Sequence, residues 1–176
     1  MKGFTIMEVI KTKKENFTIR FAEKSDMALI LNFIRELADY ENLLDEVVAT
    51  EEVLMDSLFH RKAAEVIIGE YNGEPIGFAL FFHNFSTFLG KPGIYLEDLY
   101  IKLEMRGNGY GRTLLAFLAD LALKRNCGRF EWWCLDWNKS SIDFYKSIGA
   151  ISMEDWTVYR MTDKALEDLA KEFYTR

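Results

Sequence analysis

Residues 94–112 read I-Y-L-E-D-L-Y-I-K-L-E-M-R-G-N-G-Y-G-R, and this stretch decides the fold prediction. Residues 94–101 are apolar or aromatic except at Glu97 and Asp98, which predicts a largely buried strand. Residues 106–112 place three alternating glycines between two arginines, directly before a helical pattern. The apolar stripe of that helix consists of Leu114, Leu115, Leu118, Leu121 and Ala122. The stretch therefore predicts a strand, a glycine-rich turn and a helix in succession.

The glycine-rich turn has the composition of a phosphate site. Gly107, Gly109 and Gly111 allow close backbone approach, and a helix start offers unpaired N–H groups and the positive end of the helix dipole. Their spacing differs from the dinucleotide fingerprint, and no Lys-Ser/Thr pair follows as in a P-loop. An ordinary strand-to-helix turn is the alternative interpretation. We favour pyrophosphate binding, because an ordinary turn seldom needs three alternating glycines between Arg106 and Arg112.

Strand and helix patterns continue on both sides of this stretch. Upstream, we expect a strand over 17–22, a helix over 27–40, a helix from Thr50, and strands over 63–71 and 75–82 around a tight Asn72–Gly73 turn. Residues 83–93 are expected to form a connection. Downstream, we expect a strand over 129–137, a helix over 138–148, strands over 150–153 and 156–161, the first of them optional, and a helix from Thr162. This order predicts an α/β fold whose sheet is mixed and mainly antiparallel, with parallel pairing in the later strand–helix–strand units.

Length and composition are those of one globular domain. The 176 residues are 49% hydrophobic and include only 2 prolines, which argues against disorder. There are 22 Lys and Arg against 28 Asp and Glu, so the basic face of a nucleic-acid-binding protein is not expected. No run approaches the roughly 20 apolar residues of a membrane span. We therefore expect no membrane partner. The 2 cysteines are too few for a disulfide scaffold, so we expect a cytoplasmic protein.

The order of the motifs resembles the GNAT acetyltransferases. The segments that carry this resemblance are RFAEKSD, ELADYE, GFALFF, YLEDLYI, RGNGYGR, LDWN and FYKSIGA, and they span most of residues 17–161. The segments ELADYE and YLED are most similar to the diamine (spermidine/spermine) and thialysine N-acetyltransferases. The resemblance implies one GNAT domain over 17–176, with helices on both faces of the sheet and central parallel strands that splay apart.

Acetyl-CoA is the co-substrate that the resemblance implies, with the glycine turn at its pyrophosphate. The cofactor-binding residues implied in this way are Leu99, Tyr100, Ile101, Arg106, Gly107, Asn108, Gly109, Tyr110, Gly111, Arg112, Asn138 and Ser141. At Leu99 and Ile101 the backbone, rather than the side chain, is expected to pair with the pantetheine arm. Asn138 also reads as the N-cap of the following helix, and the two roles are compatible.

Acetyl transfer to an amine needs a proton acceptor for the alkylammonium, whose pKa is about 10.4, and a proton donor for the departing thiolate. The resemblance nominates Tyr145 as the general acid and Glu97 as the carboxylate that holds the amine and passes on its proton, directly or through water. Without the resemblance, Tyr145 would be read as an aromatic on a helix face. The alternative for Glu97 is a solvated acid on a sheet face, but its apolar neighbours favour a shielded position; these neighbours are Ile94, Leu96, Leu99 and Ile101. Since neighbours in a strand point to opposite faces, Asp98 is expected to be structural.

The substrate is expected to be a primary amine. Tyr40 and Glu41 match substrate-binding positions of the polyamine enzymes, together with Glu97, although a solvated helix end is an equal alternative. The connection 83–93 has no acid where spermidine/spermine enzymes carry an aspartate, so a small aliphatic amine or lysine-like amino acid is favoured over a polyamine.

Three competing functions stay open at this point: acetylation of protein N-termini, acetylation of an antibiotic, and a non-catalytic CoA-binding regulatory module. The two histidines lack partners at ligand spacing, so no metal is expected. A homodimer is implied by the resemblance alone. Residues 1–16 form an extension of unknown role: a frayed segment, an added strand, or residues ahead of a start at Met7.

Overall fold

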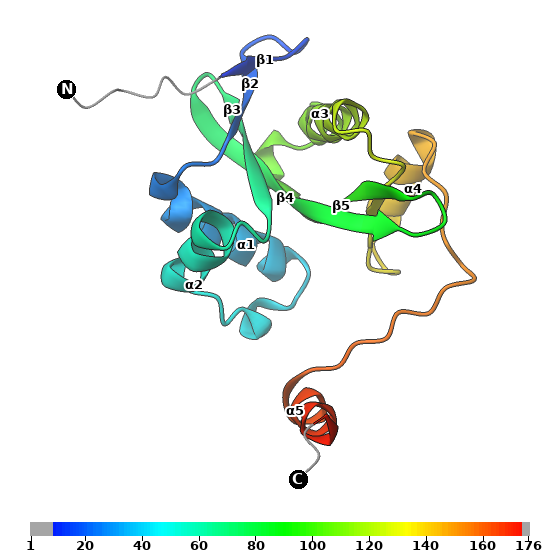
Figure 1. The fold of residues 1–176 in the computed structure, drawn as a ribbon. Coiled ribbons are helices and arrows are strands. Elements are labelled where there is room, and N and C mark those ends of the chain that lie inside the picture. Colours follow the sequence, from blue (N-terminus) through cyan, green and yellow to red (C-terminus); the bar gives the residue numbers. More distant parts are fainter. Residues whose placement is uncertain (1–8, 174–176) are drawn as a thin grey trace, which may run out of the picture. The chain divides into compact units, whose positions relative to one another are not determined.

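The computed structural model describes residues 9–173, which fall into two compact units. One unit ends at Trp133 and the other begins at Cys134. The first unit contains a six-stranded sheet with its strands in sequence order (Figure 1). The strands are β1 (Ile10–Lys11), β2 (Phe17–Phe21), β3 (Glu65–Tyr71), β4 (Glu74–Ser86), β5 (Lys91–Ile101) and β6 (Phe130–Trp132). Neighbouring strands are antiparallel except β5 and β6, which are parallel, so the predicted mixed and mainly antiparallel sheet is confirmed.

Helices cover both faces of this sheet, as expected (Figure 1). On one side lie α1 (Met27–Tyr40) and α2 (Glu51–Met55), which a π-helical turn over Asp56–His60 extends. On the other side lies α3 (Tyr110–Lys124). Short 3-10 turns occupy Lys24–Asp26, Leu44–Glu46 and Leu103–Met105. The N-cap predicted at Thr50 is confirmed, because its hydroxyl accepts a hydrogen bond from the Val53 N–H at 3.3 Å.

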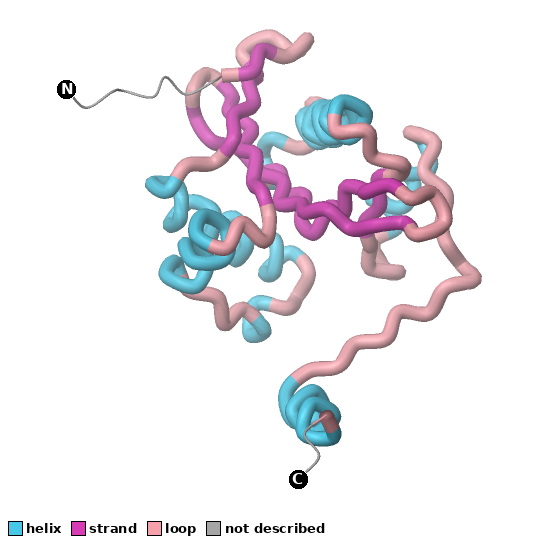
Figure 2. Tube along the Cα trace, viewed as in Figure 1, coloured by secondary structure: helices cyan, strands magenta, loops and turns pink. Residues whose placement is uncertain are grey.

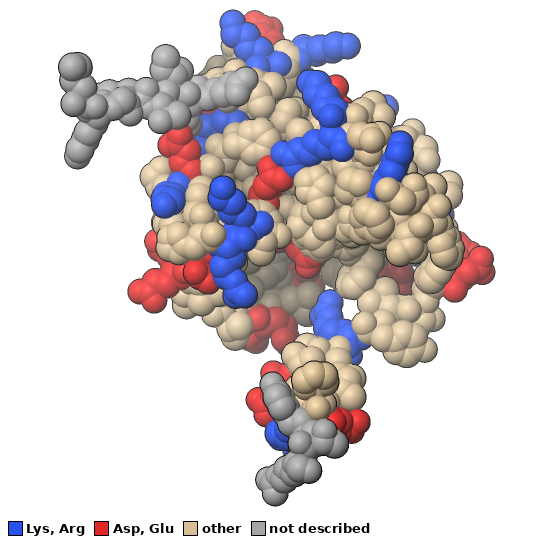
Figure 3. Space-filling model, viewed as in Figure 1, with Lys and Arg blue, Asp and Glu red and all other residues tan. Residues whose placement is uncertain are grey.

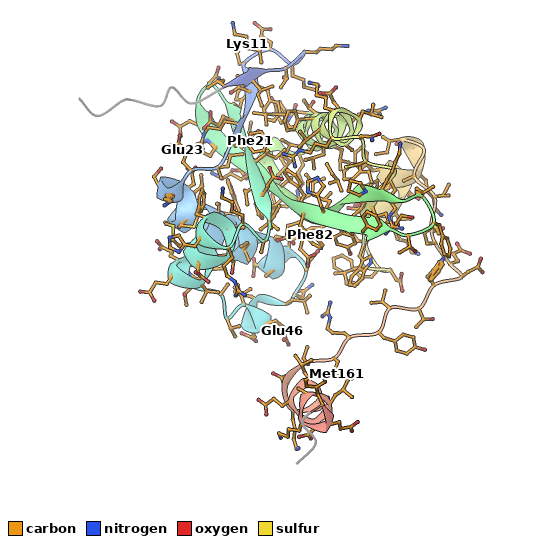
Figure 4. All side chains as sticks on the ribbon, viewed as in Figure 1. Lys11, Phe21, Glu23, Glu46, Phe82 and Met161 are labelled. Carbon is orange, nitrogen blue, oxygen red and sulfur yellow. The ribbon has the colours of Figure 1, made fainter. Side chains whose placement is uncertain are left out.

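Strand alternation gives each face of the sheet its own core. The face towards α1 buries apolar side chains of both the helix and the sheet, namely Met27, Ile30, Phe33, Val66, Ile68, Phe78 and Tyr100. The opposite face packs on α3. There the Phe17 ring lies 4.6 Å from the Tyr110 ring, and the Phe21 ring lies 6.1 Å from the Phe117 ring (Figure 4 labels Phe21).

The predicted connection over 83–93 is wrong, because most of it is strand. The long strand β4 runs to Ser86, and β5 begins at Lys91 after a turn in which Gly90 has a φ of 63°. The two strands pair from Gly77 to Ser86 in an almost continuous ladder. The aromatic residues of this segment do not alternate strictly with polar ones, so the local pattern does not predict a strand. The strands extend this far because β4 and β5 pair with each other.

The second unit contains α4 (Lys139–Ser147) and α5 (Asp163–Glu172), with residues 148–162 in neither helix nor strand (Figure 2). The strands predicted over 150–153 and 156–161 are therefore absent from the described chain, and the strand predicted over 129–137 shortens to β6. A period-two pattern shows only which side chains would share a face; the strand itself requires a partner.

Part of the N-terminal extension forms an added strand. Ile10 and Lys11 pair antiparallel with Ile19 and Thr18 of β2, so β1 is the edge strand of the sheet. Residues 1–8 of the predicted extension lie outside the described residues.

Candidate functional site

Strand β5 loses its regular register at Glu97. Leu80 of β4 faces Asp98, whereas the next residue, Phe81, faces Leu96, so Glu97 is the additional residue of a β-bulge. The expectation that Glu97 and Asp98 point to opposite faces assumed an unbroken strand, and the bulge interrupts that alternation. The Glu97 side chain is exposed and the Asp98 side chain is partly buried. The expectation that apolar neighbours would shield Glu97 is therefore wrong.

Asp98 is the most strongly perturbed carboxyl group of this region. Burial, together with the nearby charges of Glu97 and Glu41, raises the pKa of Asp98 to about 7. Burial also raises the pKa of Glu41, which follows the last residue of α1. The end of α1 and the bulge of β5 thus bring together two of the predicted substrate residues, Glu41 and Glu97. Asp98, expected to be structural, is the functional candidate that the sequence interpretation missed.

One edge of β5 presents backbone groups beyond the point where β6 ends. Strand β6 pairs with β5 at only three positions, the last at Leu96. The Lys102 N–H donates to the Ile76 carbonyl of β4 at 2.9 Å. In an antiparallel pair, successive residues point their backbone groups alternately towards and away from the partner. Leu99 and Ile101 therefore point theirs away from β4, at the edge where β5 and β6 have parted.

Tyr100 lies differently from its two neighbours. Its backbone groups point towards β4, and its side chain is 4% exposed in the core beneath α1. Burial raises the pKa of the Tyr100 hydroxyl to about 12, with the charge of Glu36 and a hydrogen bond to its carboxylate acting in the same direction. Of the three predicted cofactor residues on β5, only Leu99 and Ile101 present an edge to a ligand.

The glycine turn has the backbone that its sequence suggests. Gly107 and Gly109 have φ values of 79° and 78°, a region that favours glycine. Gly109 is the N-cap of α3, and as a glycine it has no side chain that could accept a hydrogen bond from the first turn of that helix. Asn108 instead donates from its side-chain amide to the Met105 carbonyl at 3.1 Å. The first N–H groups of α3 are therefore available to an anion.

The two arginines of the turn differ in their surroundings. The Arg106 Nε donates to the Ile101 carbonyl at 2.9 Å, and its guanidinium carbon lies 4.3 Å from the centre of the Tyr40 ring and 5.5 Å from that of Tyr100. Arg112, in the first turn of α3, is exposed. The end of α1 is therefore not a freely solvated helix end, since Tyr40 packs on the first residue of the glycine turn.

Tyr110 begins α3 with a buried side chain. Its ring lies 4.6 Å from that of Phe17 and 5.7 Å from that of Tyr71, and only 8% of the residue is exposed. The Tyr110 ring packs between α3 and the sheet, so only the backbone of Tyr110 is placed to contact a ligand at the glycine turn. Gly111 follows it inside the helix with an ordinary φ, and a Cβ atom there would lie 3.8 Å from Ile101 Cγ1, an ordinary contact.

The remaining predicted site residues belong to the second unit. Asn138 is the N-cap of α4, and its side-chain oxygen accepts hydrogen bonds from the Ser141 N–H and the Ser140 hydroxyl, each at 3.3 Å. Tyr145 lies one turn further along α4, partly buried, with its ring 5.4 Å from that of Phe144. The capping role expected for Asn138 is confirmed.

Residues 9–173 contain neither a metal-binding cluster nor a helix that could span a membrane. That part of the chain holds no cluster of three or more His, Cys, Asp or Glu side chains placed to bind a metal ion. None of its helices is long and apolar enough to cross a membrane.

Comparisons with known proteins match this chain to an acetyltransferase family model and to named acetyltransferases. Residues 31–150 match a family model described as the acetyltransferase (GNAT) family. Thialysine N-epsilon-acetyltransferase of Sus scrofa is 39% identical over 166 residues, covering 86% of this chain and 96% of that protein. L-ornithine N5-acetyltransferase of Arabidopsis thaliana is 29% identical, covering 95% of this chain and 94% of that protein. Among solved structures, an integron cassette protein of V. cholerae superposes with a TM-score of 0.74 at 28% identity, covering 90% of this chain and 99% of that one.

Proposed function

This chain belongs to the acetyltransferase (GNAT) family, and we propose that it transfers the acetyl group of acetyl-CoA to a primary amine of a small aliphatic amine, a polyamine or a lysine-like amino acid. The observation that carries this proposal is the pairing of two features on one strand–turn–helix unit. These are the open backbone edge of β5, formed by Leu99 and the N–H of Ile101, and the uncapped start of α3 behind Gly109.

Both features fit acetyl-CoA. The thioester supplies an activated acetyl group, and the pantetheine arm carries amides that can pair with a strand edge. We assign that pairing to Leu99 and Ile101 rather than Tyr100, whose backbone faces β4. The N–H groups behind Gly107 and Gly109 would hold the pyrophosphate, with the exposed Arg112 as its side-chain cation. Arg106, already engaged with Ile101 and Tyr40, would shape the turn instead.

The carboxyl groups at the bulge of β5 would hold the amine and take its proton. Glu41, Glu97 and Asp98 give this region a negative potential that attracts an alkylammonium. A proton acceptor works best when its pKa lies near the operating pH, and Asp98, at about 7, meets that condition. Glu97 remains the proposed contact for the amine, and the proton leaves through Glu97 or water, with Asp98 as the added acceptor.

Tyr145 would protonate the departing CoA thiolate. A phenol hydroxyl stays protonated at neutral pH, so it can donate a hydrogen bond to the thiolate as it leaves and then supply its proton, which water replaces. Asn138 and Ser141, at the start of the same helix, would contact the cofactor. Attack is direct in a ternary complex of enzyme, amine and acetyl-CoA, without an acetylated enzyme.

A lysine-like substrate is the favoured member of the class. The chain is similar to one protein named for thialysine and to another named for L-ornithine, and both names describe amino acids with a side-chain amine. The β4–β5 turn, which adds no carboxylate between Ser86 and Lys91, supports the same preference over a polyamine.

A thiol-release assay tests this proposal. Acetyl-CoA is offered with thialysine, ornithine, lysine, putrescine, spermidine and a peptide with a free N-terminus. Turnover on the amino acids or diamines supports the proposal. Turnover on the peptide alone contradicts the substrate class while leaving the acetyltransferase activity in place. CoA binding without turnover on any acceptor favours a regulatory module.

A cytoplasmic homodimer is part of the proposal. Its support is the family membership together with large exposed apolar side chains in the second unit, among them Trp156 at 70% and Tyr159 at 91%. The occupant proposed for that surface is a second copy of this chain.

A further inference from the structure

The turn between β1 and β2 lies directly against the glycine turn. A Cβ atom built on Gly109 would stand only 3.0 Å from both Cε and Nζ of Lys14. The Lys14 ammonium also lies 6.0 Å from the centre of the Tyr110 ring. A residue of the N-terminal extension therefore places its charge at the N-cap of α3, and Lys and Arg side chains gather over this end of the first unit (Figure 3).

Hydrogen bonds hold the backbone that carries Lys14. The Thr12 hydroxyl accepts from the Lys14 N–H at 3.1 Å and donates to the Phe17 carbonyl at 2.7 Å. The Phe17 N–H donates to the Lys14 carbonyl at 3.2 Å, and the Asn16 carbonyl accepts from Asn72 at 2.9 Å. The turn is thus fixed to β2 and to the β3–β4 hairpin, and Lys14 starts from a defined position.

Positive charge is concentrated beside the start of α3, and the exposed Lys14 ammonium is part of it. The N-terminus of a helix carries a partial positive charge, so a cation beside it is repelled. Arg106 and Arg112 add further positive charge within the same turn. Within residues 9–173, the ion pairs closer than 4.0 Å leave Lys14 without a carboxylate partner. A ligand that brings negative charge to this turn would therefore be attracted both by the helix start and by these three side chains.

We propose that Lys14 is a phosphate-binding residue of the acetyl-CoA site. The proposal rests on the proposed function, which puts the CoA pyrophosphate at the N–H groups behind Gly109. Those N–H groups give directional hydrogen bonds, and the Lys14 ammonium adds a charge-assisted one from the β1–β2 turn. The N-terminal extension thereby acquires a role in cofactor affinity.

The test compares two acetyl donors that share the same thioester. Only one of them carries the nucleotide part with its pyrophosphate. Kinetics are measured with acetyl-CoA and with S-acetylpantetheine, which lacks the pyrophosphate, for the wild type, Lys14→Met, Lys14→Arg and Lys13→Met. Lys13→Met removes the same charge from the neighbouring residue of the same turn. We expect Lys14→Met to lower kcat/KM for acetyl-CoA about tenfold relative to S-acetylpantetheine, the loss of one charge-assisted hydrogen bond. Lys14→Arg restores most of this ratio, and Lys13→Met leaves it near the wild-type value.

Two results would overturn the inference. If Lys14→Met lowers kcat/KM equally for both donors, Lys14 acts through the shape of the site and not on phosphate. If Lys13→Met and Lys14→Met change the ratio equally, the effect is one of general surface charge. Direct calorimetry of CoA binding to the wild type separates this inference from its premise. If the wild type does not bind CoA, the proposed function and this inference are overturned together. If the wild type binds CoA and Lys14→Met binds it with the same affinity, the inference alone is overturned.

Discussion

Asp98 shows how one additional residue in a strand changes the properties of its neighbour. The bulge at Glu97 sets two acidic side chains beside each other in a strand that is otherwise apolar. Burial, then Glu97, then Glu41 raise the pKa of Asp98 from 3.8 to about 7. Such an environment is expensive for the fold and useful for chemistry, because a carboxyl group that titrates near neutrality can exchange protons at the working pH.

This raised pKa predicts the sign of a stability effect. Between about pH 4 and pH 7 the unfolded chain ionises Asp98 while the folded chain keeps it protonated, so the unfolded state binds fewer protons and stability falls as the pH rises. The penalty is fully present above pH 7. Asp98→Asn, which resembles the protonated form, should therefore raise the free energy of unfolding at pH 8 by about 2 kcal/mol, allowing for partial exposure to water.

Urea denaturation at pH 5 and pH 8 measures this difference, and the gain should be smaller at pH 5. Asp45→Asn, which makes the same change at an exposed carboxyl group away from the bulge, is the matched control and should change the unfolding free energy little at either pH. A gain from Asp98→Asn that is the same at both pH values would contradict the raised pKa. The same variant should lower kcat/KM for the amine, because it removes a proton acceptor.

Tyr145 carries a second prediction at this scale, one that follows from the proposed function. Tyr145→Phe keeps the ring and removes the hydroxyl, so it should lower kcat about 10²-fold while leaving acetyl-CoA affinity nearly unchanged. Steady-state kinetics and CoA calorimetry measure the two quantities. Phe144→Leu, which alters the neighbouring ring of α4 without removing a hydroxyl, is the control. A wild-type kcat in Tyr145→Phe would remove this residue from the mechanism.

At the scale of elements, Arg106 joins the glycine turn to the end of α1. Its guanidinium packs on the Tyr40 ring and bonds the carbonyl of Ile101, the last residue of β5. The residues proposed for the cofactor and those proposed for the amine are therefore in physical contact through one side chain. A change in Arg106 should affect both substrates.

Arg106→Gln should raise KM for the amine about threefold to tenfold in addition to KM for acetyl-CoA, because it releases Tyr40 and the adjacent Glu41. Arg112→Gln is the matched variant at the other end of the same turn, where the arginine is exposed. It should raise KM for acetyl-CoA alone. Bisubstrate kinetics measure both KM values for each variant. If the two variants change the KM for the amine equally, the contact between Arg106 and Tyr40 does not contribute to amine binding.

At the scale of the whole molecule, the second unit taken by itself carries large exposed apolar side chains. Residues 148–162 contain no helix or strand, and within them Ile151, Trp156 and Tyr159 are at least 70% exposed. Monomeric proteins seldom leave large apolar patches in water. We attribute this surface to the proposed homodimer.

Sedimentation equilibrium tests that assignment. The wild type should be dimeric at micromolar concentration, and Trp156→Ser combined with Tyr159→Ser should shift it towards monomer by removing apolar contact area. The control is Val48→Ser, which removes an exposed apolar side chain from the first unit, where Val48 is 88% exposed. A wild type that sediments as a monomer at tens of micromolar would contradict the homodimer.

The sequence alone determined the features that depend on neighbouring residues. The strand, the glycine turn and α3 follow one another where the pattern of residues 94–124 predicts them, because an apolar run, a glycine at positive φ and a helical stripe are local properties. The same holds for the Asn72–Gly73 turn and for the N-cap at Asn138. The family resemblance added the proposed roles of Glu97 and Tyr145, which no local pattern could suggest.

Only the tertiary structure decided what depends on residues far apart in the chain. The bulge at Glu97 exists because β4 pairs with β5 out of step, and Arg106 meets Tyr40 because α1 packs beside the glycine turn. Lys14 reaches Gly109 because β1 joins the sheet at the edge next to β2. Residues 156–161 alternate like a strand yet form none, since a strand is completed only by hydrogen bonds to a partner. Local patterns specify what each segment can become, and long-range pairing decides which of those possibilities is realised.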